Sequence, residues 1–338
     1  MPPTARLLEK ALAARQPLLD EKHQSALRLF NGFTEGQPDL VVDLYARTLV
    51  FNNYAEVPMR GIGNIREAQA FYLEKLPWAQ AILLKTRHGT TQQEKRGLLL
   101  YGETPDRKIR ENGVWYALDL SMNRDASLYL DTRNLRQWLK DNMAGKSVLN
   151  TFAYTGSLGV AAMAAGAARV VQLDRNREFL NLAKTSYTLN GFPIVKSDFI
   201  SADFFPAINR LKHDKQAFDC VLLDPPFFSA TSKGRVDLEN DPARLINKAR
   251  PLVRNGGLLV VINNALFVSG ADFMEILDSL CLDGFVSIEE LVPVPDDFIG
   301  ARPAARVAGH PTDPAPFNHP TKIAILRIKH VEKAQPTL

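Results

Sequence analysis

The chain has 338 residues, 46% hydrophobic and 23% charged, which is typical of a globular α/β protein with more than one folding unit. Its 41 Lys and Arg against 37 Asp and Glu give a formal net charge of +4, which permits a polyanionic partner without requiring one. Two widely separated cysteines exclude a disulfide framework or a zinc site, and the lack of a membrane-length apolar run or a signal-peptide core predicts a cytoplasmic protein with no membrane partner and no metal.

The N-terminal part of the chain predicts a small strand-rich unit. Apolar residues at helical spacing indicate an amphipathic helix within residues 1–24. Short β-like runs separated by Gly, Pro and Asn predict an α+β domain over residues 25–118, which we expect to recognise RNA or another substrate. Its basic stretch, residues 87–110, has two interpretations, a nucleic-acid contact and a solvated face.

Within residues 119–330, strands and helices alternate strictly from Leu128 onward. The pattern predicts an α/β domain with a Rossmann-like, doubly wound sheet of seven strands. The last two strands, near 284–293 and 321–328, have only a proline-rich stretch between them, so we expect them to pair antiparallel at the sheet edge. Residues 331–338 are interpreted as a tail.

A glycine turn follows the first strand of this sheet. Gly156 and Gly159 let the backbone turn sharply and let a ligand approach the start of a helix. The third glycine of a dinucleotide-binding fingerprint is missing, which disfavours a pyrophosphate-binding dehydrogenase.

Acidic residues follow the next two strands. Asp174 ends the second strand, where a carboxylate can receive two ribose hydroxyls. Asp203 opens the helix after the third strand, where it could accept from an adenine amino group while Phe204 flanks the ring. Each acid has a plainer interpretation as a helix cap, but acids at the ends of three adjacent strands, with Asp224 as the third, favour a nucleoside site.

The segment Asp224-Pro225-Pro226-Phe227-Phe228 closes an apolar run that predicts a buried strand. There the carboxylate can accept a hydrogen bond from a planar donor, the prolines fix the backbone, and the rings offer a stacking wall for a flat substrate. The plainer interpretation is a turn that ends in two core phenylalanines.

Together these segments resemble the class I S-adenosylmethionine-dependent methyltransferases, specifically the group that modifies large-subunit ribosomal RNA. The residues that carry the resemblance are Tyr129-Leu130-Asp131-Thr132-Arg133, the run from Val148 to Gly156, Asp174, Asp203 and Asp224-Pro225-Pro226. The resemblance implies a catalytic domain over residues 119–330.

The resemblance also implies S-adenosylmethionine as the cofactor. The glycine turn would hold its methionine part, Asp174 the ribose and Asp203 the adenine, and Arg133 could pair with the methionine carboxylate. The implied cofactor-binding residues are Tyr129, Arg133, Asn150, Phe152, Tyr154, Thr155, Gly156, Asp174, Arg175, Asp203, Phe204 and Asp224.

The positions of the cysteines limit which substrate atom can accept the methyl group. Relatives that methylate carbon 5 of cytosine attack the ring with a thiolate, and neither Cys220 nor Cys281 lies where those relatives carry it. The pair Asn263-Asn264, with the Asp224 segment, instead resembles the catalytic half of the bifunctional enzyme that forms 7-methylguanosine. N7 of guanine has an in-plane lone pair, so its methylation requires no base. The same segment suits an exocyclic amine, so both guanine nitrogens stay open.

The sequence therefore predicts an enzyme that methylates a base, with a guanine nitrogen favoured, in large-subunit ribosomal RNA. The predicted catalytic residues are Asp224, Pro225, Pro226 and Phe227, and the predicted substrate-binding residues are Phe228, Asn263, Asn264 and Lys322, with Asn318 and His319 beside them. The alternatives are a methyltransferase for a small aromatic or a protein amide and a silent cofactor- and RNA-binding paralogue. A plain turn is the alternative for the asparagine pair, and the oligomeric state is open, with a homodimer as one option.

Overall fold

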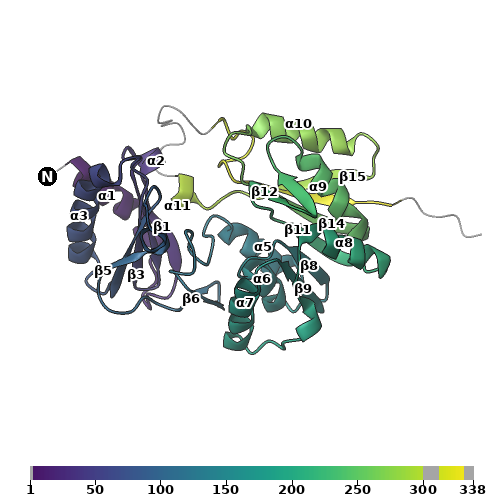
Figure 1. Cartoon of the computed structure of the whole chain (residues 1–338), viewed down its shortest axis with the longest axis horizontal. Helices are drawn as coiled ribbons and strands as arrows, with labels where there is room; N and C mark the ends of the chain where they lie inside the picture. Colours follow the sequence, from purple (N-terminus) through teal and green to yellow (C-terminus); the bar gives the residue numbers. More distant parts are fainter. Residues whose placement is uncertain (1–2, 300–311, 331–338) are drawn as a thin grey trace, which may run out of the picture. The chain divides into compact units, whose positions relative to one another are not determined.

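The computed structural model of the protein describes residues 3–299 and 312–330, and Figure 1 shows its helices and strands. The described chain divides into two compact units. The first comprises residues 3–133, 185–191 and 295–299, and the second comprises residues 134–184, 192–294 and 312–330. Among these residues, no helix has both the length and the apolar character needed to cross a membrane.

The first unit contains a five-stranded sheet with the strand order β1-β2-β3-β4-β5. Its strands pair antiparallel except β3 and β4, which are parallel and are connected by α3. Apolar side chains of α1 and α3 pack on one face of this sheet. The elements are α1 (Pro3–Arg15), η1 (Gln16–Leu18), β1 (Ala26–Asn31), α2 (Gly32–Glu35), β2 (Leu40–Tyr45), β3 (Thr48–Asn53), α3 (Pro58–Lys75), β4 (Ala81–Thr86), α4 (Gln92–Arg96), β5 (Leu98–Tyr101), the hairpin β6 (Lys108–Glu111) and β7 (Val114–Ala117), and α11 (Asp296–Ile299).

The first unit extends past the boundary that the sequence predicts at residue 118. The ammonium group of Lys85 donates hydrogen bonds to the backbone carbonyls of Asn123 (2.9 Å) and Asp125 (3.2 Å). The hydroxyl of Tyr45 donates to the carbonyl of Leu128 at 3.0 Å. These bonds explain why residues 119–133 group with the first sheet, although the sequence prediction assigns them to the second domain.

The second unit contains a seven-stranded sheet with the order β10-β9-β8-β11-β14-β16-β15. All neighbours are parallel except β16, which is antiparallel to both β14 and β15. The predicted doubly wound sheet and the antiparallel pairing of its last two strands are confirmed. Its elements are α5 (Arg133–Asn142), β8 (Ser147–Thr151), α6 (Ser157–Ala164), β9 (Arg169–Asp174), α7 (Arg177–Leu189), η2 (Lys196–Asp198), β10 (Phe199–Ser201), α8 (Phe204–His213), β11 (Phe218–Leu223), β12 (Phe228–Thr231), β13 (Gly234–Asp237), α9 (Pro242–Ala249), η3 (Arg250–Leu252), β14 (Val253–Asn263), α10 (Gly270–Cys281), β15 (Val286–Leu291) and β16 (Lys322–Ile328).

Helices cover both faces of this sheet, and the side chains of β11 alternate between two cores. Val221 and Leu223 pack with residues of α8, α9 and α10, whereas Cys220 and Leu222 pack with residues of α5 and α6. A strand buried on both faces is a nearly continuous apolar run, which is why the sequence predicts β11 with its observed bounds.

The structure differs from the sequence prediction at three places in this unit. The third strand, expected over 194–199, is displaced to β10 and follows the single turn η2. The helix expected over 239–253 ends at Ala249 because Pro251 cannot continue it, and β14 begins at Val253. The hairpin of β12 and β13 is not predicted at all.

Candidate active site

Three predicted acids lie at one edge of the second unit's sheet. Asp174 is the last residue of β9, Asp203 follows β10, and Asp224 follows β11. Because these strands run parallel, their carboxyl ends lie at the same edge, where open α/β sheets bind ligands. We refer to it as the carboxyl edge.

The loop after β8 has an unusual backbone. Phe152 (φ 53°), Tyr154 (φ 50°) and Gly156 (φ 76°) alternate into the left-handed region, which is costly for residues with a side chain. The carboxylate of Asp174 holds this loop by accepting the backbone N–H of Tyr154 at 2.8 Å. Such strain, held in place by a neighbouring strand, is typical of ligand-binding loops.

The carboxylate of Asp174 is largely desolvated. Burial raises its pKa, opposed by hydrogen bonds from the backbone N–H groups of Asn176 and Tyr154. The backbone N–H of Arg175 also donates to this carboxylate, which has about four acceptor positions, so about one position remains after the three bonds. Asp174 therefore has a structural role and keeps the capacity to accept a ribose hydroxyl.

Gln172 is a residue of this site that the sequence prediction missed. It is fully buried in β9, accepts from the amide of Asn150 at 2.8 Å and donates to the carbonyl of Gly156 at 3.3 Å. A Cβ atom on Gly159 would lie 2.1 Å from the Gln172 amide nitrogen, so this glycine is required for packing. The signal in the sequence was an amide side chain inside an otherwise apolar strand.

Asp203 caps α8, as its plainer interpretation proposed. One carboxylate oxygen accepts from the backbone N–H of Phe205 (3.1 Å) and the other from the hydroxyl of Thr231 (2.9 Å). The rings of Phe152 and Phe204 stack with centroids 4.6 Å apart, next to this cap. The cap and the stacked rings together line the carboxyl edge beside β10.

The segment after β11 exposes its aromatic rings. Phe227 is 36% exposed and Phe228 is 53% exposed, while Pro225 is buried and Asp224 is half-buried. The rings of Phe227 and Phe267, the latter also exposed, lie 6.3 Å apart. The interpretation of this segment as a turn ending in core phenylalanines is therefore wrong.

The two asparagines at the end of β14 have different roles. Asn264 donates from its amide to the carbonyl of Pro225 at 3.4 Å, and its buried side-chain oxygen has no hydrogen-bond partner among the described residues. Asn263 is fully buried, and its oxygen accepts the backbone N–H of Ala265, as in the turn interpretation. Asn264 is thus the member of the pair that touches the Asp224 segment.

Lys322 is also fully buried. Its ammonium donates to the carbonyls of Ala265 (2.9 Å) and Pro320 (2.7 Å), and burial lowers its pKa to about 8. Asn318 pairs with the backbone of Val294, and His319 accepts the N–H of Thr321. These contacts shape the loops, and substrate contacts by Lys322 and Asn263 stay predictions.

Two predicted cofactor residues, Tyr129 and Arg133, belong to the first unit. The guanidinium of Arg133 donates to both carboxylate oxygens of Asp297 and to the carbonyl of Ala26. The hydroxyl of Tyr129 donates to Asp125 at 3.3 Å. A methionine carboxylate bound by Arg133 would therefore share that guanidinium with Asp297. Of the remaining predicted residues, Thr155 is buried and Arg175 is exposed.

Neither cysteine offers a thiolate at the carboxyl edge. Cys220 is fully buried within β11, and burial raises its pKa to about 12. Burial likewise raises the pKa of Cys281, at the end of α10. A nucleophilic cysteine requires a lowered pKa, so the chemistry of this site must use other groups.

Comparisons with known proteins agree with this geometry. A family model described as S-adenosylmethionine-dependent methyltransferase matches residues 68–308. The chain is 30% identical to ribosomal RNA large subunit methyltransferase I of Shewanella amazonensis over 309 residues, 88% of this chain and 76% of that protein. It is 32% identical to ribosomal RNA large subunit methyltransferase K/L of Psychrobacter arcticus over 277 residues, 76% of this chain and 34% of that protein. A crystal structure of a methyltransferase candidate complexed with SAH has the same fold, with a TM-score of 0.81 at 22% identity, and the match covers 96% of this chain and 81% of that one.

The residues at the carboxyl edge fit S-adenosylmethionine, the cofactor of this family. Asp174 and Asp203 supply acceptors for hydroxyl and amino groups, and the buried oxygen of Asn150 has no partner among the described residues. A Cβ atom on Gly156 would lie 2.6 Å from that of Ala183, so the turn brings the backbone close without a side chain. When bound, the cofactor supplies an electrophilic methyl group on a sulfonium. The chain belongs to the S-adenosylmethionine-dependent methyltransferase family.

Proposed function

We propose that this methyltransferase modifies a guanine nitrogen in large-subunit ribosomal RNA. The observation that carries the proposal is the segment after β11, where two exposed rings, Phe227 and Phe228, adjoin the carboxylate of Asp224. Exposed aromatic rings stack on bases, and a carboxylate accepts the N–H groups of the Watson–Crick edge of guanine. These are the groups that a flat, hydrogen-bonding acceptor requires.

Ribosomal RNA is favoured as the substrate by the names of two relatives, each a ribosomal RNA large subunit methyltransferase. A small aromatic or a protein amide is the alternative acceptor for the same segment. An RNA substrate also agrees with the cytoplasmic location predicted from the sequence. To reach the site, a base in RNA would be turned out of its stack.

Nitrogen is favoured over carbon because Cys220 is buried and the pKa of both thiols is raised. Carbon 5 of cytosine becomes nucleophilic only after attack by a thiolate, whereas N7 of guanine has an in-plane lone pair. Transfer to N7 releases no proton. Transfer to the 2-amino group releases one, and we assign Asp224, the carboxylate of the segment, to receive it.

The main contribution of the protein to either reaction is to align the acceptor nitrogen with the methyl group, since methyl transfer is an in-line displacement. Asn264 holds the carbonyl of Pro225, and the two prolines fix the backbone between Asp224 and the rings. We expect these residues to orient the base while the rings exclude water from it.

The test is incubation of the enzyme with tritiated S-adenosylmethionine and undermethylated ribosomal RNA, followed by mass spectrometry of the nucleosides. We expect labelled 7-methylguanosine or N2-methylguanosine, and the two products separate the two nitrogens. The Asp224→Ala variant should bind the cofactor and lose at least about a hundredfold in transfer rate.

Three results would contradict the proposal. Labelled 5-methylcytidine would exclude the nitrogen assignment, and absence of label in RNA would favour a small-molecule or protein acceptor or a silent paralogue. Full activity of Asp224→Ala, with its cofactor affinity unchanged in calorimetry, would remove Asp224 from the reaction.

A further inference from the structure

The hairpin of β12 and β13 begins at the acceptor segment itself. Phe228, the most exposed ring of that segment, is the first residue of β12. The backbone N–H of Leu238, after β13, donates to the carbonyl of Phe227 at 3.1 Å and closes the hairpin base. The hairpin therefore continues the surface on which we expect the target base to stack.

The far end of the hairpin is attached to the predicted cofactor site. The hydroxyl of Thr231 donates to the carboxylate of Asp203 at 2.9 Å. A Cβ atom on Gly234 would lie 2.2 Å from the ring of Phe205, so the turn packs directly on the start of α8. The hairpin is thus held at both ends next to groups that bind the two reactants.

Three basic side chains lie on the hairpin and on the start of α9. Lys233, Arg235 and Arg244 are all exposed, and the guanidinium of Arg235 lies 5.2 Å from the centroid of the Phe228 ring. The guanidinium of Arg244 lies 5.7 Å from the ring of Phe205. Neither Lys233 nor Arg244 forms an ion pair with a carboxylate among the residues that the structure describes.

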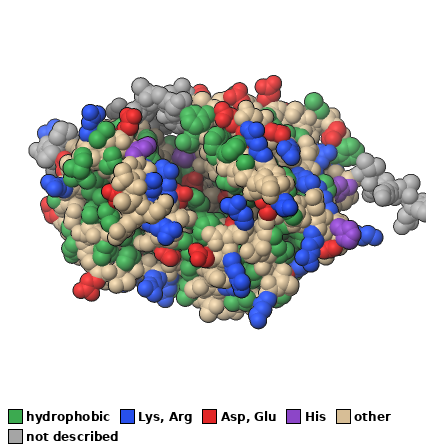
Figure 2. All heavy atoms as spheres, in the orientation of Figure 1, with side chains coloured by type: hydrophobic (Ala, Val, Ile, Leu, Met, Phe, Trp, Pro, Cys, Tyr) green, Lys and Arg blue, Asp and Glu red, His purple; other side chains and the backbone are tan. Residues whose placement is uncertain are grey.

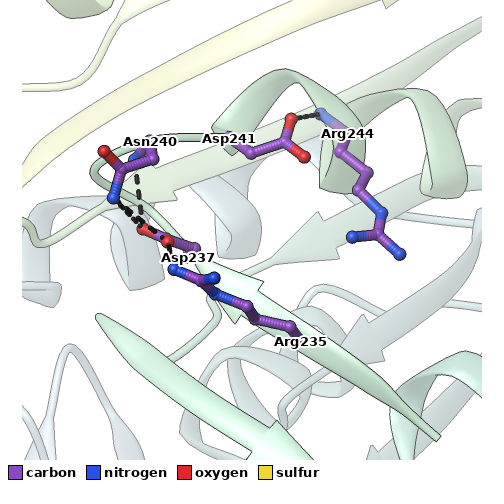
Figure 3. A pocket seen from close by; sticks show the side chains of 5 residues that line it. All are labelled: Arg235, Asp237, Asn240, Asp241 and Arg244. Carbon is purple, nitrogen blue, oxygen red and sulfur yellow. Dashed lines mark hydrogen bonds and ion pairs between the residues drawn. The ribbon is translucent and has the colours of Figure 1, made fainter.

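A pocket of about 160 Å³ opens between β13 and α9 (Figure 3). Its lining residues are Arg235, Asp237, Asn240, Asp241 and Arg244. The acids are occupied by local structure, because Asp237 binds Arg235 and Asn240 while Asp241 caps the backbone N–H of Arg244. In Figure 3 the guanidinium of Arg244 extends away from both carboxylates, so its positive charge is available to a ligand.

Exposed apolar side chains, two of them aromatic, also lie at the carboxyl edge. Phe228 (53%), Phe267 (48%) and Leu266 (49%) are exposed there, and exposed apolar groups that gather on a surface mark interaction sites. Figure 2 shows several Lys and Arg side chains on the face where Figure 1 draws β12 and α9. Exposed rings interleaved with cations are the groups that bind single-stranded nucleic acids, since bases stack on the rings and phosphates pair with the cations.

We infer that the β12–β13 hairpin and the first turn of α9 bind the single-stranded RNA that flanks the target base. The inference rests on the proposed function and specifies it. Phe228 with Arg235 would stack a neighbouring base, and Lys233 and Arg244 would contact phosphates on its strand. Segments without exposed bases, such as an RNA duplex, should bind this surface less tightly.

The test combines one charge variant and one ring variant. The double variant Lys233→Gln with Arg244→Gln should weaken binding of a fluorescent single-stranded RNA oligonucleotide and lower the slope of log affinity against log salt by about 1.4. Phe228→Ala should weaken binding about tenfold and leave that slope unchanged. With ribosomal RNA as substrate, the charge variant should raise KM and keep kcat.

A matched control removes two arginines from elsewhere in the same unit. Arg210 lies in the last turn of α8, and Arg254 lies near the start of β14, at the amino ends of the strands. The double variant Arg210→Gln with Arg254→Gln changes the net charge equally, and its RNA affinity should stay within about twofold of the wild type. Equal weakening by both double variants would overturn the inference in favour of unspecific attraction.

Cofactor binding and RNA labelling separate this inference from the proposed function. The hairpin variants should bind S-adenosylmethionine with unchanged affinity in calorimetry, which shows that they fold. Wild-type labelling of ribosomal RNA, combined with unchanged RNA affinity and KM in the hairpin variants, would overturn the inference alone. Hairpin-dependent oligonucleotide binding without any labelling by the wild type would support the RNA surface and contradict the proposed guanine methylation.

Discussion

The two edges of the second unit's sheet use the same strands for different purposes. At the amino edge, Asp219 of β11 accepts from the backbone N–H and the hydroxyl of Ser147, each at 2.7 Å, and from Arg254 at 2.7 Å. Burial opposes ionisation there, but these partners outweigh it and lower the pKa of Asp219. Each of these contacts joins one strand to its neighbour.

At the carboxyl edge the residues are in less favourable environments and conformations. Burial raises the pKa of Asp174, two residues with side chains adopt positive φ, and aromatic rings are exposed to solvent. Strain and desolvation that would only destabilise a structural edge become useful where a ligand replaces water. One edge therefore stabilises the fold and the other keeps binding capacity, and the following variants test that division.

We expect the strongest change in the affinity for the cofactor. Asp174→Ala should weaken S-adenosylmethionine binding about a hundredfold, because the ribose hydroxyls lose a charged acceptor and the loop at Tyr154 loses its anchor. Calorimetry measures the change, and circular dichroism checks the fold. Asp219→Asn, at the amino edge, should keep wild-type affinity, and an unchanged affinity in Asp174→Ala would end the ribose assignment.

Two glycines on either side of β8 compare the edges directly. Gly145 (φ 70°) precedes the strand and a Cβ atom there would meet nothing within 4 Å, whereas at Gly156 (φ 76°) it would lie 2.6 Å from the Cβ of Ala183. Gly145→Ala should therefore cost about 1 kcal/mol of unfolding free energy, from backbone strain alone. Gly156→Ala should cost about 2 kcal/mol, since overpacking adds to that strain. Urea unfolding measures both, and equal costs would show that the turn at Gly156 is not a close approach.

The alternating strands and helices of the second unit were predictable because parallel strands are buried on both faces. The run from Phe218 to Leu223 is apolar at nearly every position, and its expected bounds are those of β11. The hairpin of β12 and β13 has four residues in each strand and few apolar ones, so no period could develop. Its turn also lacks the residue pairs that mark short hairpins.

The positions of the site acids were predictable, but the exposure of their neighbours was not. Asp174 and Asp203 follow apolar strands, and this order alone brings them to one edge. Burial of Asn263 and Lys322 depends on loops that close over them from β14 and β16, which no local pattern reveals. The role of Gln172 likewise depends on a partner in the adjacent strand, Asn150.

The smallest expected effect is the pH dependence of stability, which should have opposite signs at the two edges. Because the folded pKa of Asp219 lies below its unfolded value, its contribution is complete above the unfolded value and is lost as pH falls through the folded pKa. Arg254→Gln removes a pair that is about half exposed, so solvent screening limits its cost to about 0.5 kcal/mol at neutral pH. That cost should disappear in acid, where Asp219 is protonated.

The folded pKa of Asp174 lies above its unfolded value, so its ionisation destabilises the fold as pH rises through that interval. Urea unfolding over a pH series should therefore show Asp174→Asn gaining stability relative to the wild type with rising pH and Arg254→Gln losing it. Parallel trends in the two variants would mean that both edges are stabilised in the same way and that the division between them is wrong.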